Sequence, residues 1–176
     1  MFLPQIYDYF VLNVSSPNTP GLRTLQNKTA LDELFKAVQG RNSQLSTLSS
    51  QPSSKPVLVK IAPDLEYSQI DEILELVGAY GIQGIIATNT TLDHSGISPS
   101  KWQQGGLSGK PLRGRSTEIV RYIASKSSAP VIASGGIFDA DSAKEKMDAG
   151  ASLVQLYTGF VYRGPALVRE VREAIG

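Results

Sequence analysis

The chain has 176 residues, of which 41% are hydrophobic and 19% are charged, a composition typical of one globular domain with a sizeable core rather than of a disordered chain. Seventeen basic residues against sixteen acidic ones leave a net charge of +1, and without a Lys/Arg cluster this argues against nucleic-acid binding. Because the sequence has no cysteine, disulfide bonds, thiolate metal sites and cysteine nucleophiles are excluded.

Short apolar runs rich in β-branched residues recur along the chain, and each ends in Gly, Pro, Ser, Thr or Asn. Near-continuous runs of this length are typical of parallel strands that are buried on both faces. None approaches the ~20 apolar residues needed to span a bilayer, so we expect the chain alone to be soluble. We predict five strands, at 9–14, 57–62, 84–88, 130–133 and 152–157.

The segments between these strands are predicted to be mainly helical. Apolar residues recur at positions i, i+3, i+4 and i+7 in 31–38 and 70–77, and 165–175 carries an apolar face. Residues 43–55, SQLSTLSSQPSSK, are Ser-rich and lack periodicity, so we predict a surface loop insertion without function. Candidate N-caps and glycine helix ends separate the segments: Asn27 and Ser68, and Gly40 and Gly150.

The alternation of strand and helix leaves two architectures open, a doubly wound open sheet and a (β/α) barrel. A closed barrel needs eight strands and usually about 250 residues. With five predicted strands, the chain forms either an open sheet or part of a barrel.

Polar side chains gather at the carboxyl end of each predicted strand, where parallel α/β folds build their sites. Lys60 is the most informative, because it interrupts an apolar run that should carry no charge. A buried ammonium costs several kcal/mol unless an anion or a strong acceptor meets it. A functional role is therefore favoured over an edge-strand lysine whose ammonium reaches water.

Glycines follow the last three predicted strands, in 105–112, 134–136 and 157–159. These turns are compatible with phosphate binding by backbone N–H groups, and equally with plain tight turns. The single histidine, His94, lies in a predicted loop and is more typical of a solvent-exposed side chain than of a catalytic one.

Five motifs, taken together and in this order, closely resemble dihydroorotate dehydrogenases of the quinone-dependent class 2. The resemblance runs from Asp8 to about Gly164. It implies a (β/α)8 TIM barrel that holds FMN at its C-terminal mouth and oxidises dihydroorotate to orotate in UMP biosynthesis, with quinone as the electron acceptor. The motifs are NVSSPNTPGL at 13–22, LVKIAPD at 58–64, ATNTT at 87–91, GGLSGKPL at 105–112 and GASLVQLYTG at 150–159.

The resemblance also implies roles for individual residues. Ser16 matches the catalytic base, a position at which the related class 1 enzymes have cysteine, and no metal is implied. The substrate positions that it implies are Asn13, Val14, Ser15, Ser16, Pro17, Asn18, Asn89 and Thr90. The implied FMN contacts are Asn13, Lys60, Thr88, Gly109, Gly136, Tyr157 and Thr158.

The five predicted strands would correspond to the fourth through eighth of the barrel, so that 1–176 is expected to be the C-terminal part of an FMN-binding domain. Full-length family members are peripheral proteins of the bacterial or mitochondrial inner membrane, and their quinone site would lie mostly outside this chain. We expect this chain alone to bind FMN poorly or not at all.

Two alternatives to this enzyme stay open. The first is an inactive half-barrel that acts only as a binding or assembly module. The second is another FMN-dependent barrel oxidoreductase, such as a dihydropyrimidine dehydrogenase domain, although the cysteine base usual there is absent from this sequence.

Overall fold

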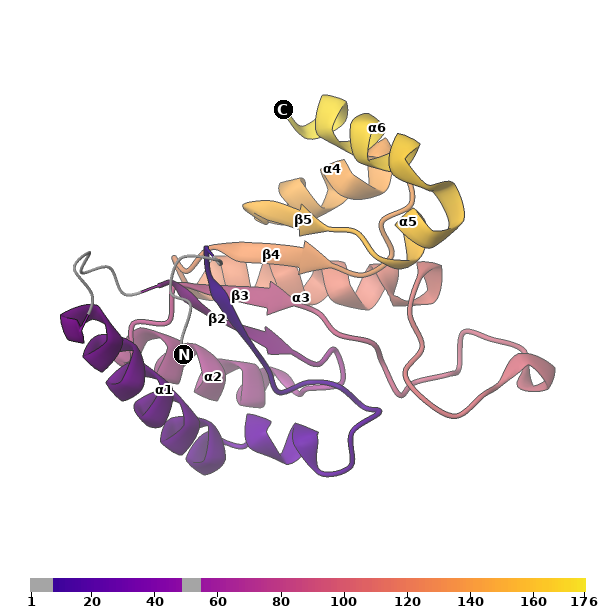
Figure 1. Ribbon diagram of the computed structural model, residues 1–176. Helices are drawn as coiled ribbons and strands as arrows, with labels where there is room; N and C mark the ends of the chain where they lie inside the picture. The colour runs from indigo at the N-terminus through magenta and orange to yellow at the C-terminus, as the bar shows by residue number, and fades with distance from the viewer. Residues whose placement is uncertain (1–7, 49–54) are drawn as a thin grey trace.

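A computed structural model describes residues 8–48 and 55–176. Their five strands form a single parallel sheet whose spatial order follows the chain (Figure 1). All five predicted strands are confirmed: four are slightly shorter than their apolar runs, and the fourth is shifted by one residue from 130–133 to 131–134. The strands are β1 (Phe10–Asn13), β2 (Val57–Ile61), β3 (Gly84–Ala87), β4 (Val131–Ser134) and β5 (Leu153–Gln155).

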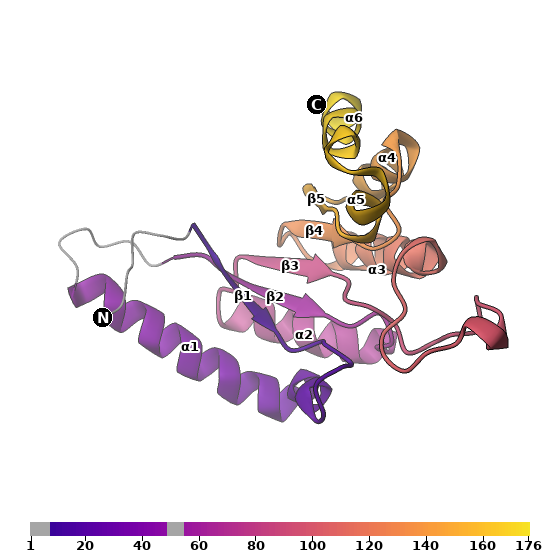
Figure 2. The same cartoon turned by 45° about the vertical axis from the view of Figure 1, so that its right-hand side comes forward.

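Helices connect successive strands and follow around the outside of the sheet, as Figures 1 and 2 show from two directions. Sequential parallel strands joined by helices, in a sheet without reversal of strand order, are the wall of a (β/α) barrel rather than a doubly wound sheet. The α-helices are α1 (Lys28–Leu48), α2 (Tyr67–Ala79), α3 (Arg113–Lys126), α4 (Ala140–Asp148), α5 (Thr158–Arg163) and α6 (Pro165–Ile175). Short 3-10 helices are η1 (Leu22–Gln26), η2 (Pro99–Lys101) and η3 (Lys110–Leu112).

The main core lies between the sheet and its helices, and the two edge strands are less covered than the middle ones. All four residues of β3 are buried, whereas Phe10 and Val11 of β1 are 37% and 38% exposed and Leu153 of β5 is 60% exposed. A closed barrel would have no such edges. The structure is therefore an incomplete barrel with two open sides.

Helix α1 corrects the prediction of a Ser-rich loop at 43–55. The helix continues through Gly40 to Leu48, so the loop prediction is wrong for 43–48, while 49–54 lie outside the described residues. Gly40 ends no helix because it does not adopt the positive φ of a C-terminal glycine. The Asn42 side chain donates to the Lys55 carbonyl at 2.9 Å and links this helix to the start of β2.

Of the other predicted helix boundaries, those at Asn27 and Gly150 agree with the structure and that at Ser68 does not. Asn27 directly precedes α1, and its carbonyl accepts from the Leu31 N–H at 2.9 Å. Gly150 follows α4 with a φ of 99°. Ser68, however, lies inside α2, because Glu66 has the extended N-cap conformation and its N–H donates to the Gln69 side chain at 2.9 Å.

Candidate active site

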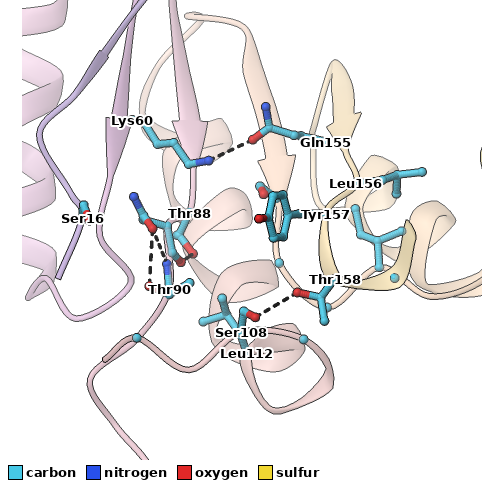
Figure 3. Close-up of a pocket in the computed structure, with 18 of the residues that line it drawn as sticks. Ser16, Lys60, Thr88, Thr90, Ser108, Leu112, Gln155, Leu156, Tyr157 and Thr158 are labelled. Atoms are coloured by element: carbon cyan, nitrogen blue, oxygen red, sulfur yellow. Dashed lines mark hydrogen bonds between the residues drawn. The ribbon is translucent and has the colours of Figure 1, made fainter. Parts of the chain in front are cut away.

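A cavity of about 540 Å³ opens at the carboxyl edge of the sheet, and residues at or after the carboxyl ends of the five strands line it (Figure 3). The lining residues come together at this edge because the carboxyl ends of parallel strands all lie on the same side of the sheet. Among the described residues that line the cavity, Lys60 is the one charged residue, and none carries a carboxylate. The pocket thus presents amides, hydroxyls, backbone groups and a single cation, a set that suits an anionic, hydrogen-bonding ligand.

Lys60 and Gln155 point toward each other across the cavity (Figure 3), and the lysine Nζ donates to the Gln155 Oε1 at 2.9 Å. Lys60 lies on β2 and Gln155 on β5, with two strands between them. Because side chains stand roughly perpendicular to a sheet, this bond requires the sheet to curl toward the cavity. Burial lowers the pKa of Lys60 from its ordinary value. An anionic ligand beside it would favour the charged form.

An amide and hydroxyl network joins the loops after β1 and β3. The Asn89 Nδ2 donates to the Asn13 Oδ1 at 3.1 Å and to the Ser15 Oγ at 3.0 Å, and the Ser15 hydroxyl donates to the same Asn13 oxygen at 3.0 Å. The Asn89 Oδ1 accepts from the Thr90 N–H at 2.8 Å. These bonds fix the orientation of the Asn13 and Asn89 side-chain amides, both of which line the cavity.

Ser16 lies on the β1 side of the cavity, opposite Tyr157 (Figure 3). Its Oγ accepts a hydrogen bond from the Asn18 N–H at 3.3 Å, and within the described part of the chain its own proton has no acceptor. Asn18 is held in turn, because its Oδ1 accepts from the Gly106 N–H at 3.2 Å. The hydroxyl is therefore oriented by its loop yet available to a ligand.

At the other end of the cavity the backbone approaches closely and offers donors. In 8–48 and 55–176 no acceptor is paired with the N–H groups of Gly136, Thr158 or Gly159. Gly136 has a φ of 74°, and a Cβ there would lie 2.4 Å from the Arg113 Cβ. The Ser108 and Thr158 hydroxyls share a hydrogen bond of 2.9 Å beside these donors. Converging N–H groups of this kind bind phosphate and similar anions.

Comparison with known proteins decides the family. Residues 2–176 match the sequence profile of dihydroorotate dehydrogenase. The chain belongs to the dihydroorotate dehydrogenase family. Among relatives named dihydroorotate dehydrogenase (quinone), that of Christiangramia forsetii is 51% identical over 96% of this chain and 48% of its own length. That of a Synechococcus strain is 49% identical over 94% of this chain and 44% of its own length.

Solved dihydroorotate dehydrogenases agree with the fold. The enzyme of Eimeria tenella in complex with ferulenol superposes with a TM-score of 0.87 at 37% identity, over 96% of this chain and 49% of that one. The ligand-free form gives a TM-score of 0.85 at 39% identity, over 96% and 50%. The chain thus spans about half the length of the dihydroorotate dehydrogenases it matches, and its five-stranded sheet is part of their barrel.

The structure brings most of the residues implied by the family resemblance to this one cavity. Three do not line it: Val14 and Ser15 are buried behind the loop, and Pro17 packs near Gly106. Tyr157 lines it but is 79% exposed, because the open side of the incomplete barrel is next to it. The residues that line it are Asn13, Ser16, Asn18, Lys60, Thr88, Asn89, Thr90, Gly109, Gly136, Tyr157 and Thr158.

Several residues that line the cavity were not predicted as site residues. Gln155 ends β5 and was not distinguished in the sequence from the other polar residues at strand ends. It contacts Lys60 because the sheet curls. Ser108 and Ser134 carry no signal beyond their place after a strand. His94 lies outside the pocket, where its Nδ1 contacts the Leu92 carbonyl and its ring packs against Trp102.

Two features are absent from the described residues. No three His, Cys, Asp or Glu side chains come together as a metal site would require. Among the described helices, none has the length and apolar character needed to cross a membrane.

Proposed function

We propose that this chain carries the substrate and flavin residues of a quinone-dependent dihydroorotate dehydrogenase, which oxidises dihydroorotate to orotate in UMP biosynthesis. One observation carries the proposal: the Ser16 hydroxyl, the Asn13 amide and the Lys60 ammonium line the same cavity. The chain would form the C-terminal part of the barrel, strands four to eight. Quinone and the peripheral membrane location of full-length relatives would involve mainly the remainder of such an enzyme.

The cavity fits FMN at both ends. The free N–H groups of Gly136, Thr158 and Gly159 would hold its phosphate. Lys60, with Thr88 beside it, would contact the ring and stabilise negative charge there, which explains a cation in an otherwise apolar strand. Bound FMN supplies the hydride acceptor of the oxidation and passes the electrons to quinone.

Ser16 is proposed as the base that takes the proton from dihydroorotate. A hydroxyl is a weak base, so its proton must leave as the substrate proton arrives, and water must be kept away. The Asn18 N–H bond orients the Oγ without using its proton. Ser16 would take the substrate proton at its Oγ and pass its own proton through a hydrogen-bonded relay to solvent, while bound FMN would supply the hydride acceptor that the new carbon–carbon double bond requires.

The asparagines are proposed to bind the pyrimidine and its carboxylate. Each primary amide offers two donors and an acceptor in one plane, which matches a ring bearing amide groups. Asn13 and Asn89 are held by their mutual bond of 3.1 Å, and Asn18 by Gly106. Rigid amides reduce the entropy lost on binding. Thr90 adds a hydroxyl at the same end of the cavity.

A chimera tests the proposal directly. This chain would replace the matching residues of the Christiangramia forsetii relative, so that the barrel is complete. We expect dihydroorotate-dependent reduction of a quinone, and we expect Ser16→Ala to bind FMN normally while its flavin reduction slows by about 100-fold or more. Thr19→Ala, in the same loop but outside the cavity, is the control.

The outcomes separate the alternatives. A folded chimera that binds FMN without oxidising dihydroorotate would leave the chain as an assembly module. Parental flavin reduction in Ser16→Ala would remove Ser16 as the base.

A further inference from the structure

Arg23 lies in η1, outside the cavity, yet its guanidinium reaches the three loops that follow β1, β2 and β3. Its Nε donates to the Ser15 carbonyl at 3.0 Å, its Nη1 to the Asp64 carboxylate at 2.6 Å and its Nη2 to the Thr90 carbonyl at 2.7 Å. Its side chain is 20% exposed. All three nitrogens of the group are therefore engaged, each with a different loop.

Asp64 completes the connection from the loop after β2. Its carboxylate accepts from the Thr91 hydroxyl, from the Leu92 N–H at 3.1 Å and from Arg23. Each oxygen is in use, and two of the donors belong to the loop after β3. We call the set formed by Arg23, Asp64 and the carbonyls of Ser15 and Thr90 the Arg23 bridge.

The bridge differs from an ordinary surface ion pair, which contributes little to stability. Two of its bonds go to the carbonyl of Ser15, next to Ser16, and to that of Thr90, both of which belong to the proposed substrate end. A guanidinium is a rigid planar fork, so it sets the distance between these two carbonyls. Lysine has one nitrogen and cannot reproduce that geometry.

We infer that Arg23 is a positioning residue, which holds the Ser16 loop and the Asn89–Thr90 loop at a fixed separation across the substrate end of the cavity. The inference rests on the proposed function only for the identity of the ligand. Arg23 does not line the cavity, so it acts through the two backbones and not by contact with substrate.

The test compares Arg23→Lys with Arg115→Lys in this 176-residue chain. Arg115 is a matched control, because its guanidinium also donates to two backbone carbonyls, those of Pro63 and Leu65, but contacts neither Ser15 nor Thr90. Hydrogen–deuterium exchange would be followed at residues 14–18 and 88–92. We expect exchange about tenfold faster in both loops of Arg23→Lys and unchanged there in Arg115→Lys.

Two readouts separate positioning from a general loss of structure. We expect Arg23→Lys to weaken orotate binding about tenfold while leaving the affinity for inorganic phosphate at the glycine end unchanged. In Arg23→Ala, added methylguanidinium should restore slow exchange in both loops. Unchanged exchange in Arg23→Lys, or an equal loss of orotate and phosphate binding, would overturn the inference. If the unsubstituted chain binds no orotate, the exchange and rescue data alone decide the role of Arg23, and the chimera decides the proposed function.

Discussion

Lys60 combines burial with a neutral partner, which makes its charge sensitive to pH. Its Nζ donates to Gln155, and desolvation lowers its pKa below that of a free lysine. The ammonium form therefore predominates below the lowered pKa and is lost, as pH rises, earlier than in an exposed lysine. The affinity of the pocket for an anion should therefore fall when Lys60 loses its charge.

We predict that the FMN affinity of the chimera falls as pH rises through the lowered pKa of Lys60, because the cation beside the ring is lost, and that this fall begins at a lower pH than an ordinary lysine would give. Quenching of flavin fluorescence would measure the affinity at each pH. Lys60→Met should bind FMN more weakly at pH 7 and show a flatter pH dependence. An identical slope in both proteins would contradict the assignment of this titration to Lys60.

Gly106 is required at its position by space alone. A Cβ there would lie 1.9 Å from the Thr90 Oγ1 and 2.7 Å from the Pro17 Cγ. We predict that Gly106→Ala lowers the free energy of unfolding by about 1–3 kcal/mol, measured by urea denaturation. Gly114→Ala is the control, since Gly114 lies in α3 with nothing within 4 Å, and it should be neutral or stabilising by up to about 1 kcal/mol.

At the scale of elements, α4 is fastened to α3 by a buried lysine. Lys146 is fully buried, and its Nζ donates to the Arg113 carbonyl at 2.9 Å and to the Ser116 and Thr117 hydroxyls at 2.5 Å each. Beside it, Glu145 forms an ion pair with Arg113 at 2.5 Å. Burial lowers the pKa of Lys146 from 10.5 to about 8.

A pH dependence of stability follows from this shift. Between pH 8 and 10.5 the unfolded chain retains the Lys146 proton that the folded chain has released, so stability rises with pH in that window. The shift corresponds to about 3 kcal/mol. We predict that the difference in unfolding free energy between the parent and Lys146→Met changes by this order across the window, in urea titrations at each pH. A constant difference would show that Lys146 does not titrate there.

The strands were predictable and the helix ends less so, for physical reasons. Continuous β-branched runs such as 57–62 have few alternatives to a buried strand, and all five became strands. Residues 43–48 lack an apolar period, yet α1 continues through them, because serine weakens a helix only slightly and Gly40 keeps helical geometry. Ser68 lost the N-cap position to Glu66, which has a partner in Gln69.

In the site, too, some features could be predicted from the sequence and others could not. Residues at strand ends could be assigned to one edge from the sequence, since parallel strands share it. The Lys60–Gln155 bond could not, because it depends on how far the sheet curls. Arg23 is a loop arginine without periodicity, and only the placement of three loops gives it its partners.

At the scale of the whole molecule, the two open edges dominate. Within residues 8–48 and 55–176, β1 and β5 each pair on one side only, and Val11 and Leu153 are exposed on them. Unpaired strands with exposed apolar side chains promote association. We predict concentration-dependent self-association in sedimentation experiments, reduced by the double substitution Val11→Lys and Leu153→Lys.

Leu92→Lys provides the control for this prediction. Leu92 is 53% exposed but lies in the loop after β3, away from the edge strands. It should leave the sedimentation behaviour unchanged. Equal effects of both charge changes would mean that net charge, and not the strand edges, governs association.

The bond from Lys60 to Gln155 joins the first and the last of four adjacent strands, β2 to β5. The curvature that this bond requires is therefore already present in a sheet of five strands, where strand twist and helix packing can set it without a closed barrel. For protein engineering, this means that the chain could be fused behind a half-barrel from another protein and keep its arrangement of side chains. The added half would need only to supply the remaining strands of the barrel.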